Sequence, residues 1–151
     1  PRSLWASEAP FPVDFVLGAA LMVRREAIHQ VGLLDDGFFM YCEEMDWCLR
    51  MQEAGWRIYA APAARVIHHE GQSSKQVRWR SFERLWRSRL RFFRKHHNRY
   101  SSRFLLAVNG LLRIGLGLRA QLAWRAFAAG RVDGAALRQE LTAYANVSRM
   151  L

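Results

Sequence analysis

The positive charge of this chain is concentrated in one stretch. Between Lys75 and Arg103 stand eleven lysines and arginines and a single acid, Glu83, whereas the other residues carry twelve basic and twelve acidic side chains. The net charge of +10 in 151 residues therefore belongs to this stretch. A chain divided in this way is expected to fold as two parts. We place them at residues 1–74 and at residues 75–151, which are basic and apolar.

The first part mixes extended and helical patterns. Residues 13–25 form an apolar run that is typical of a strand, and residues 57–61 and 64–68 are predicted to be two short strands. Helices are predicted over 26–31 and 43–54, because each run ends at a glycine. A mixture of this kind indicates an α/β unit. These strands make an incomplete sheet, which indicates that an N-terminal part of the domain is missing.

The second part is predicted to be helical. The pattern favours helices over residues 81–97, 104–128 and 134–150. The middle helix is apolar, but an arginine recurs at every sixth position, and the three point in different directions: Arg113, Arg119 and Arg125. Because no run of ~18–20 uncharged residues exists, this helix is not expected to span a membrane.

The cysteines and the start of the chain limit the compartment and the completeness of the protein. Cys42 and Cys48 lie six residues apart, which is neither a metal-binding spacing nor a disulfide framework. This cysteine usage fits a reducing, cytoplasmic setting. The chain begins at Pro1 without a methionine and shows no signal peptide, so we interpret it as a fragment or a processed product.

One acid lies on the apolar side of its predicted helix. At about 100° per residue, Glu44 falls between Cys48 and Met51, in the first turn of the helix over 43–54. A carboxylate there either accepts hydrogen bonds from the free backbone N–H groups of the helix start or acts as a functional group. A reaction in which a hydroxyl attacks needs such a group, because a hydroxyl is a weak nucleophile until a base takes its proton.

Several motifs of the first part occur in a fixed order. They are Gly18-Ala19, Met22-Val23-Arg24-Arg25, the run from Val31 to Arg50, Gly55-Trp56-Arg57, Pro62 and the run from Val66 to Ser74. In this order and spacing, residues 13–74 resemble the second half of inverting family-2 glycosyltransferases, in particular bacterial rhamnosyltransferases and related cell-surface polysaccharide enzymes. The resemblance implies an α/β fold. Residues 1–74 would form the C-terminal, acceptor-side half of a GT-A (Rossmann-like) domain, followed by a mainly helical basic extension.

The resemblance also implies roles for individual residues. Glu44, the second acid of a pair, takes the position of the catalytic base, where the family has aspartate. The glutamate places the carboxylate one methylene further out, and a misplacement of about 1 Å is costly in catalysis. The residues implied to contact the acceptor sugar are Gly18, Ala19, Glu43 and Asp46.

Some of these residues have a structural interpretation as well. Asp46 can form a salt link with Arg50, four residues further along the helix. Gly18 and Ala19 can reflect tight packing at the end of a strand.

Two further pairs of residues stand near the predicted base. Trp47 and Trp56 offer flat faces on which a sugar can stack, but packing in the core is the favoured interpretation. Asp35 and Asp36 resemble the loop that leads to the base, and a turn with a solvated acid explains them equally well.

The resemblance implies a nucleotide-sugar donor and a divalent cation, Mg²⁺ or Mn²⁺, beside its diphosphate. His68 stands where the family places a histidine that helps to hold this cation; a structural or solvated histidine is the alternative. The family's Asp-x-Asp-type motif, which holds metal and diphosphate, is absent from the twelve residues before Val13. The isolated chain is therefore expected to lack the donor site.

The predicted helix over 81–97 has two unlike faces. Aromatic and aliphatic side chains lie on one face, and five cations gather on the other: Arg84, Arg87, Arg91, Arg94 and Lys95. This pattern is typical of a helix that lies on anionic lipid. It predicts peripheral attachment to the inner face of the cell membrane, which suits a lipid-linked glycan as acceptor. The alternative is a helix docked on the protein core with a solvated basic face.

Two other functions stay open. A basic stretch with Trp and Phe can bind single-stranded nucleic acid, but a single helical stripe without a recognised fold makes such a partner unexpected. The glutamate at position 44 and the short chain also fit a remnant that binds glycan or lipid without catalysis.

Overall fold

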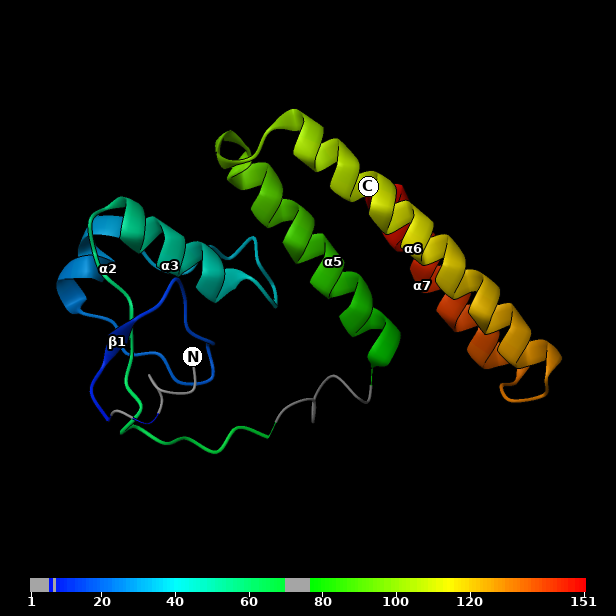
Figure 1. The fold of residues 1–151 in the computed structure, drawn as a ribbon, viewed down its shortest axis with the longest axis horizontal. Coiled ribbons are helices and arrows are strands. Elements are labelled where there is room, and N and C mark those ends of the chain that lie inside the picture. Colours follow the sequence, from blue (N-terminus) through cyan, green and yellow to red (C-terminus); the bar gives the residue numbers. More distant parts are fainter. Residues whose placement is uncertain (1–5, 7, 70–76) are drawn as a thin grey trace. The chain divides into compact units, whose positions relative to one another are not determined.

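The computed structural model describes residues 6, 8–69 and 77–151 (Figure 1). The chain divides into two compact units, residues 1–72 and residues 73–151, with the boundary beside the change in charge balance. The division predicted between residues 74 and 75 falls within residues 70–76, which lie outside the described residues.

The first unit contains two short helices and a minimal sheet. Its elements are β1 (Phe11–Pro12), α2 (Arg25–Val31), α3 (Glu43–Glu53) and β2 (Tyr59–Ala60). The two strands pair antiparallel, with Phe11 opposite Ala60, and the backbone N–H of Val13 extends the pairing to the carbonyl of Ile58 at 3.0 Å. Figure 1 shows α2 beside α3, in agreement with the contacts between them.

The strands predicted from the sequence are largely wrong. Residues 13–24 and 61–69 have no regular secondary structure, and within the described residues the Rossmann-like sheet is not evident. The physical reason is that an apolar run becomes a strand only when neighbouring strands satisfy its backbone groups and cover its faces. The sheet of the expected α/β unit is therefore not evident: the first unit is mostly irregular around two short helices, both of which occur where the pattern predicts them.

The core of the first unit forms between α3, α2 and the loop segments around them. Its buried members are Ala27, Trp47, Cys48, Met51 and Ile58. Half-buried apolar residues of the 13–23 segment pack against this cluster, among them Val16 and Leu21. The segment predicted as a strand thus contributes to the core as an irregular layer.

The second unit is a set of long helices, as predicted. They are α5 (Arg78–Lys95), the short η1 (His97–Arg99), α6 (Ser102–Ala128) and α7 (Gly134–Met150). Ser101 caps α6 by accepting a hydrogen bond from the Phe104 N–H at 3.2 Å, and Asp133 caps α7 through the Ala136 N–H at 2.7 Å. α7 packs against both α5 and α6. The buried centre consists of Leu116, Tyr144 and Val147.

The aromatic face of α5 packs on protein rather than facing outward. Trp79, Phe82 and Trp86 surround the centre of the second unit, and the rings of Trp79 and Phe82 each lie 5.7 Å from that of Tyr144, edge to face. This packing favours the docked helix as the interpretation of the aromatic face, and attachment of the chain to a membrane stays a prediction. Of the five cations predicted on the opposite face of α5, four are exposed and one is half-buried: Arg87, Arg91, Arg94 and Lys95, with Arg84 the half-buried one.

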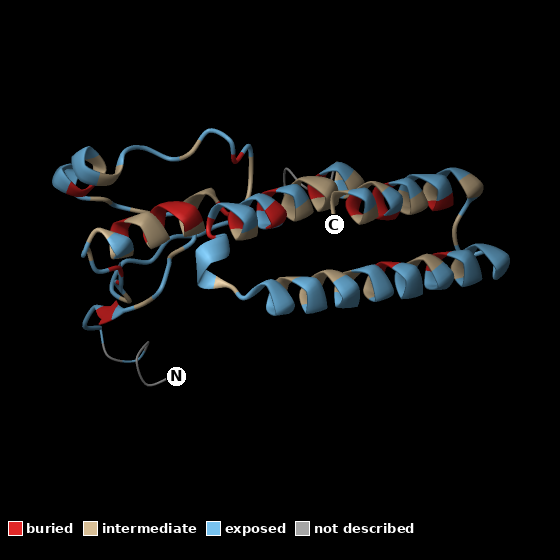
Figure 2. Ribbon diagram, turned by 90° about the horizontal axis from the view of Figure 1, so that it is seen from above, coloured by how far each residue is buried: buried red, intermediate tan, exposed pale blue. Residues whose placement is uncertain are grey.

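α6 differs from the other helices in its exposure. Figure 2 shows most of its length in the colour of exposed residues. Among the described residues, it is the one helix whose length and composition would allow it to cross a membrane; its most apolar window has a mean hydropathy of 1.2 and is 6% buried. The arginines of this helix predict that it does not span a membrane, whereas its length and mean hydropathy would allow it to do so.

Candidate functional site

The predicted base lies at the start of α3, behind an unusual turn. Tyr41 and Cys42 both adopt positive φ angles, 71° and 66°, which is uncommon for residues other than glycine. Cys42 is the N-cap residue, and no side chain caps the helix. The turn therefore delivers the chain directly into a first helical turn that contains three acids, Glu43, Glu44 and Asp46.

Glu44 is a half-buried carboxylate with a raised pKa. Burial is the main cause, the charge of Glu43 adds to it, and a hydrogen bond with the backbone N–H of Glu44 itself opposes it. The Oε2 atoms of Glu43 and Glu44 are both buried, and neither has a hydrogen-bond partner among the residues that the structure describes. A carboxylate oxygen in this state is ready to accept a proton or a hydrogen bond from a ligand.

The structure places Gly18 next to Glu44. A Cβ atom added at Gly18 would lie 3.8 Å from the Cβ atom of Glu44, so the backbone of this turn passes close to the side chain of the acid. Ala19 follows in the same exposed turn. The two segments that the resemblance assigns to one site, residues 18–19 and 43–44, are thus neighbours in space.

Cys48 also lies near Glu44, although no role was predicted for it from the sequence. Its side chain is fully buried, and its pKa is raised by burial first, with the charge of Glu44 adding to this and a hydrogen bond with the Val16 backbone opposing it. The sequence did contain a sign that the two side chains are neighbours, because Cys48 follows Glu44 by four residues, which is about one helical turn.

Asp46 forms the predicted salt link. Its fully buried carboxylate accepts from Arg50 Nε at 2.9 Å. Arg50 also donates to the carbonyls of Val31 at 2.5 Å and Leu33 at 2.8 Å. The carboxylate of Asp46 offers no surface to a sugar in this arrangement. Its predicted acceptor contact therefore gives way to the structural alternative, which ties α3 to the loop after α2.

The tryptophans and the turn acid also have structural contacts. Trp47 is buried in the core and donates from Nε1 to the carbonyl of Gly32 at 2.8 Å, and Trp56 donates to Gln30 Oε1 at 2.8 Å. Asp35 Oδ1 accepts from the Gly37 N–H at 2.9 Å, as expected of an acid at the start of a turn. The core interpretation of Trp47 is therefore confirmed.

His68 lies exposed on an irregular segment, not on a strand. Within residues 6, 8–69 and 77–151, no three His, Cys, Asp or Glu side chains gather closely enough to hold a metal ion. The described residues thus do not form a metal site by themselves. The role of His68 and the divalent cation stay predictions.

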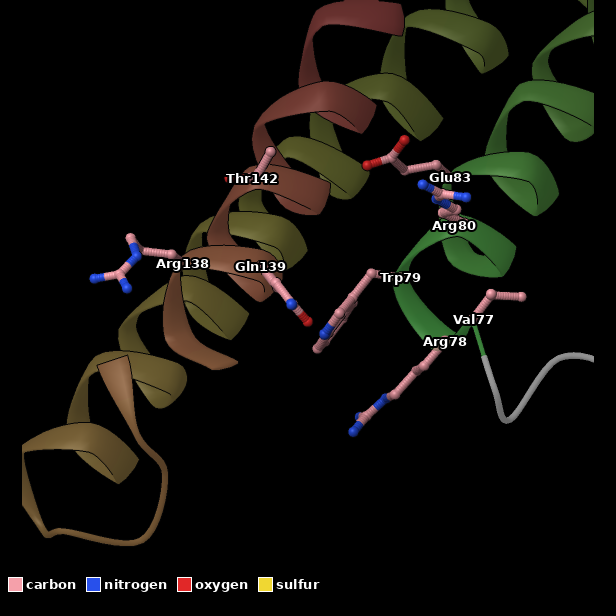
Figure 3. A pocket seen from close by; sticks show the side chains of 8 residues that line it. All are labelled: Val77, Arg78, Trp79, Arg80, Glu83, Arg138, Gln139 and Thr142. Atoms are coloured by element: carbon pink, nitrogen blue, oxygen red, sulfur yellow. The ribbon is translucent and has the colours of Figure 1, made fainter. Parts of the chain in front are cut away.

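The second unit contains an open pocket of about 640 Å³ between α5 and α7. Figure 3 shows the side chains that line it: Val77, Arg78, Trp79, Arg80, Glu83, Arg138, Gln139 and Thr142. The guanidinium of Arg78 lies over the ring of Trp79, 4.7 Å from its centroid. None of the residues predicted for catalysis or acceptor binding lines this pocket.

A buried acid at a helix start beside a glycine turn is an arrangement suited to an enzyme that deprotonates a hydroxyl. The chain belongs to glycosyl transferase family group 2, whose family model matches residues 3–145. The family resemblance seen in the motifs is therefore confirmed.

Several relatives are rhamnosyltransferases. The chain is 38% identical over 100 residues to rhamnosyltransferase WbbL of Escherichia coli K12, covering 61% of this chain and 38% of that protein. It is 43% identical over 63 residues to N-acetylglucosaminyl-diphospho-decaprenol L-rhamnosyltransferase of Mycobacterium tuberculosis, covering 42% of this chain and 20% of that protein. It is 26% identical over 70 residues to dTDP-rhamnosyl transferase RfbF of Shigella flexneri, covering 46% and 24%.

The chain spans less than two fifths of the length of each of these relatives. No solved structure matches it.

Proposed function

We propose that this chain is the acceptor-side part of an inverting glycosyltransferase that moves rhamnose, or a related hexose, from a nucleotide-sugar to a hydroxyl of a lipid-linked or cell-surface glycan. The observation that carries this proposal is the state of Glu44: half-buried, raised in pKa, with one unpartnered buried oxygen, and next to Gly18. The names of the relatives support the choice of substrates, since they include a dTDP-rhamnosyl transferase and an enzyme acting on a diphospho-decaprenol.

Glu44 would act as the general base. Its Oε2 takes the proton of the acceptor hydroxyl while the hydroxyl oxygen forms a bond to the anomeric carbon of the donor sugar. The bond from that carbon to the diphosphate oxygen breaks, and the diphosphate leaves with the electron pair. A raised pKa suits this task, because a carboxylate that is reluctant to be charged is a stronger base.

Glu43 and Gly18 would shape the acceptor position. The buried Oε2 of Glu43 is available to accept a hydrogen bond from a second sugar hydroxyl. Gly18 has no side chain, so an acceptor can approach the backbone beside Glu44 closely. Ala19 continues this surface with a side chain of one methyl group.

Two parts of the proposal rest on the sequence and on the family resemblance, not on the geometry of the site. A divalent cation would offset the charge of the leaving diphosphate when it is bound, with His68 as one ligand; the steps supplied by Glu44 do not depend on its position. The enzyme would be cytoplasmic and attached to the inner face of the cell membrane, where a lipid-linked acceptor is found.

The test is replacement of Glu44 in the intact enzyme. Glu44→Gln keeps the shape and removes the proton acceptor, so turnover should fall by at least ~10²-fold with donor binding little changed. Glu44→Asp should retain activity. Glu26→Gln is a matched control, because Glu26 is an exposed acid in the first turn of α2, the neighbouring helix.

The assay follows transfer of labelled rhamnose from dTDP-rhamnose to a lipid-linked N-acetylglucosamine, and donor binding is measured separately by calorimetry. Normal turnover by Glu44→Gln would show that another group is the base. Donor binding without transfer by the unmodified enzyme would favour the non-catalytic glycan-binding alternative.

A further inference from the structure

The outer face of α6 is apolar over most of its length. Five aliphatic side chains spaced along it are between 56% and 70% exposed: Leu106, Leu111, Ile114, Leu118 and Leu122. Trp124 is exposed further along the same helix. Figure 2 shows how little of α6 is covered within the second unit. An exposed apolar surface of this extent on a helix marks a site of interaction with a partner or a membrane.

These side chains share one side of the helix. At about 100° per residue, with Ile114 at 0°, they fall between about −80° and +80°, and Trp124 falls on the edge of the same arc. The buried residues Leu116 and Ala123 lie near 180–200°, on the side that packs in the helical unit. α6 therefore has two apolar faces, one covered by protein and one uncovered in this unit.

The arginines of α6 frame the outer face without interrupting it. Arg113 falls at about −100°, next to one edge of the arc, and Arg119 at about +140°, roughly 60° beyond the other edge. Arg103 and Arg125 lie on the arc, but at the two ends of the apolar stretch. α6 contains no acid. A helix with an apolar stripe, cationic edges and no negative charge is complementary to an anionic lipid surface.

We infer that α6 is the element that inserts into the membrane surface, lying in its plane with the outer face buried among the acyl chains and Arg113 and Arg119 reaching the lipid phosphates. This inference rests on the peripheral attachment proposed above and assigns it to α6, in place of the aromatic face of α5. A helix of 27 residues is about 40 Å long, so its cations span several headgroups.

Two other arrangements fit the observations less well. A helix that crossed the bilayer would carry Arg113 and Arg119 through the hydrocarbon, together with the charged residues of α7, which packs against it. A second copy of the chain placed against this face would bring four arginines from each helix together with no acid on α6 to pair with them.

The first test measures binding of the 151-residue chain to vesicles by flotation at low salt. The chain should bind vesicles of phosphatidylcholine with phosphatidylglycerol, and bind pure phosphatidylcholine weakly. The triple variant Leu111→Gln, Ile114→Gln, Leu118→Gln should lower the partition coefficient by at least about tenfold, since three side chains leave the acyl region. These side chains are exposed, so circular dichroism should show an unchanged fold.

The matched control replaces three exposed aliphatic side chains that lie outside α6. Leu33, Val66 and Ile67 are also strongly exposed, and they lie outside α6. The triple variant Leu33→Gln, Val66→Gln, Ile67→Gln should bind anionic vesicles like the unmodified chain. Loss of binding in both triple variants would mean that general apolarity, and not α6, drives attachment, and would overturn the inference.

The second test reports the depth of the helix. Cys42 and Cys48 are buried, so an environment-sensitive fluorophore can be attached to Cys introduced as Ile114→Cys on α6, and to Gln139→Cys on the exposed side of α7 as reference. The label at 114 should shift to the blue with anionic vesicles and lie at acyl-chain depth below the headgroups, whereas the label at 139 should stay in water.

The outcomes separate the alternatives. No flotation with anionic vesicles would end the peripheral attachment itself. Flotation that is unaffected by the α6 triple variant, but weakened by Arg87→Gln with Arg91→Gln on α5, would overturn the assignment to α6 alone. A label at the bilayer centre would show a spanning helix, and a lipid-free dimer that the α6 triple variant dissociates would show a second copy as the occupant.

Discussion

Replacing Arg50 with alanine should destabilise the first unit more than any other change of one surface-reaching side chain in it. Arg50 has one fifth of its side chain exposed, yet it pairs with the fully buried carboxylate of Asp46 and donates to two backbone carbonyls, those of Val31 and Leu33. Arg50→Ala removes the cationic partner of a buried charge and leaves both carbonyls without this donor. α3 and the loop after α2 then lose their common anchor.

The size of the effect follows from these contacts. Removing one partner of a buried ion pair costs about 3–5 kcal/mol, and partial exposure of Arg50 places this pair at the lower end. Each lost carbonyl hydrogen bond adds roughly 0.5–1.5 kcal/mol. A unit of about 70 residues has a total stability of roughly 3.5–10 kcal/mol. We therefore expect Arg50→Ala to remove a large part of the stability of the first unit, on the order of 3 kcal/mol or more.

The assay is hydrogen exchange followed by mass spectrometry across a urea series. Peptides from α3 should lose protection at a urea concentration lower by roughly 2–3 M, whereas peptides from α7, which belongs to the other unit, serve as internal reference. Arg50→Lys keeps the charge but loses the geometry that lets arginine bond three groups at once. The urea concentration at which its α3 peptides lose protection should therefore lie between those of the unmodified chain and Arg50→Ala. A shift in α3 of less than about 1 kcal/mol for Arg50→Ala would refute this account of the ion pair.

Three further changes test other parts of the structure. Because burial raises the pKa of Glu44 above its usual value of 4.5, the base is charged only at higher pH; kcat/KM of the intact enzyme should rise with pH along a limb displaced upward from that value, and a pH–rate profile of Glu44→Gln should lack the limb. Gly18→Ala should be tolerated, since the new Cβ meets the Glu44 Cβ at 3.8 Å, whereas Gly18→Val should lower kcat/KM for the acceptor with donor binding unchanged in calorimetry. Val147→Ala, at a site 1% exposed, should cost the second unit roughly 2 kcal/mol in thermal unfolding and leave the α3 peptides as protected as before.

The helices could be predicted from the sequence because their signals are local. The predicted helix over 43–54 corresponds to Glu43–Glu53, and the one over 134–150 to Gly134–Met150, which Asp133 caps through its side chain. The strands could not be predicted, because a strand depends on neighbouring strands that are often distant in the chain. The apolar run over 13–25 packs irregularly against α3 instead.

The site was predictable in part for the same reason. The place of Glu44 on the apolar side of α3 and the salt link from Asp46 to Arg50 both follow from helical periodicity. The approach of Gly18 to Glu44 does not follow from periodicity, because it joins residues 26 positions apart; the family resemblance implied it. The positive φ angles of Tyr41 and Cys42 had no signal, since neither residue is a glycine or an asparagine.

The two cationic helices show what periodicity cannot decide. A helical pattern tells which face of α5 is apolar, but protein and lipid both cover such a face, and here Tyr144 of α7 provides the cover. α6 is apolar on two sides, and α7 can cover only one of them. Counting arginines along α6 argues against a spanning helix, but their angular positions carry more information, because they border the outer face and leave it uncharged from Phe104 to Ala120. The strongly amphipathic α5 is thus a helix of the protein core, and the weakly amphipathic α6 is the one with a face left for lipid.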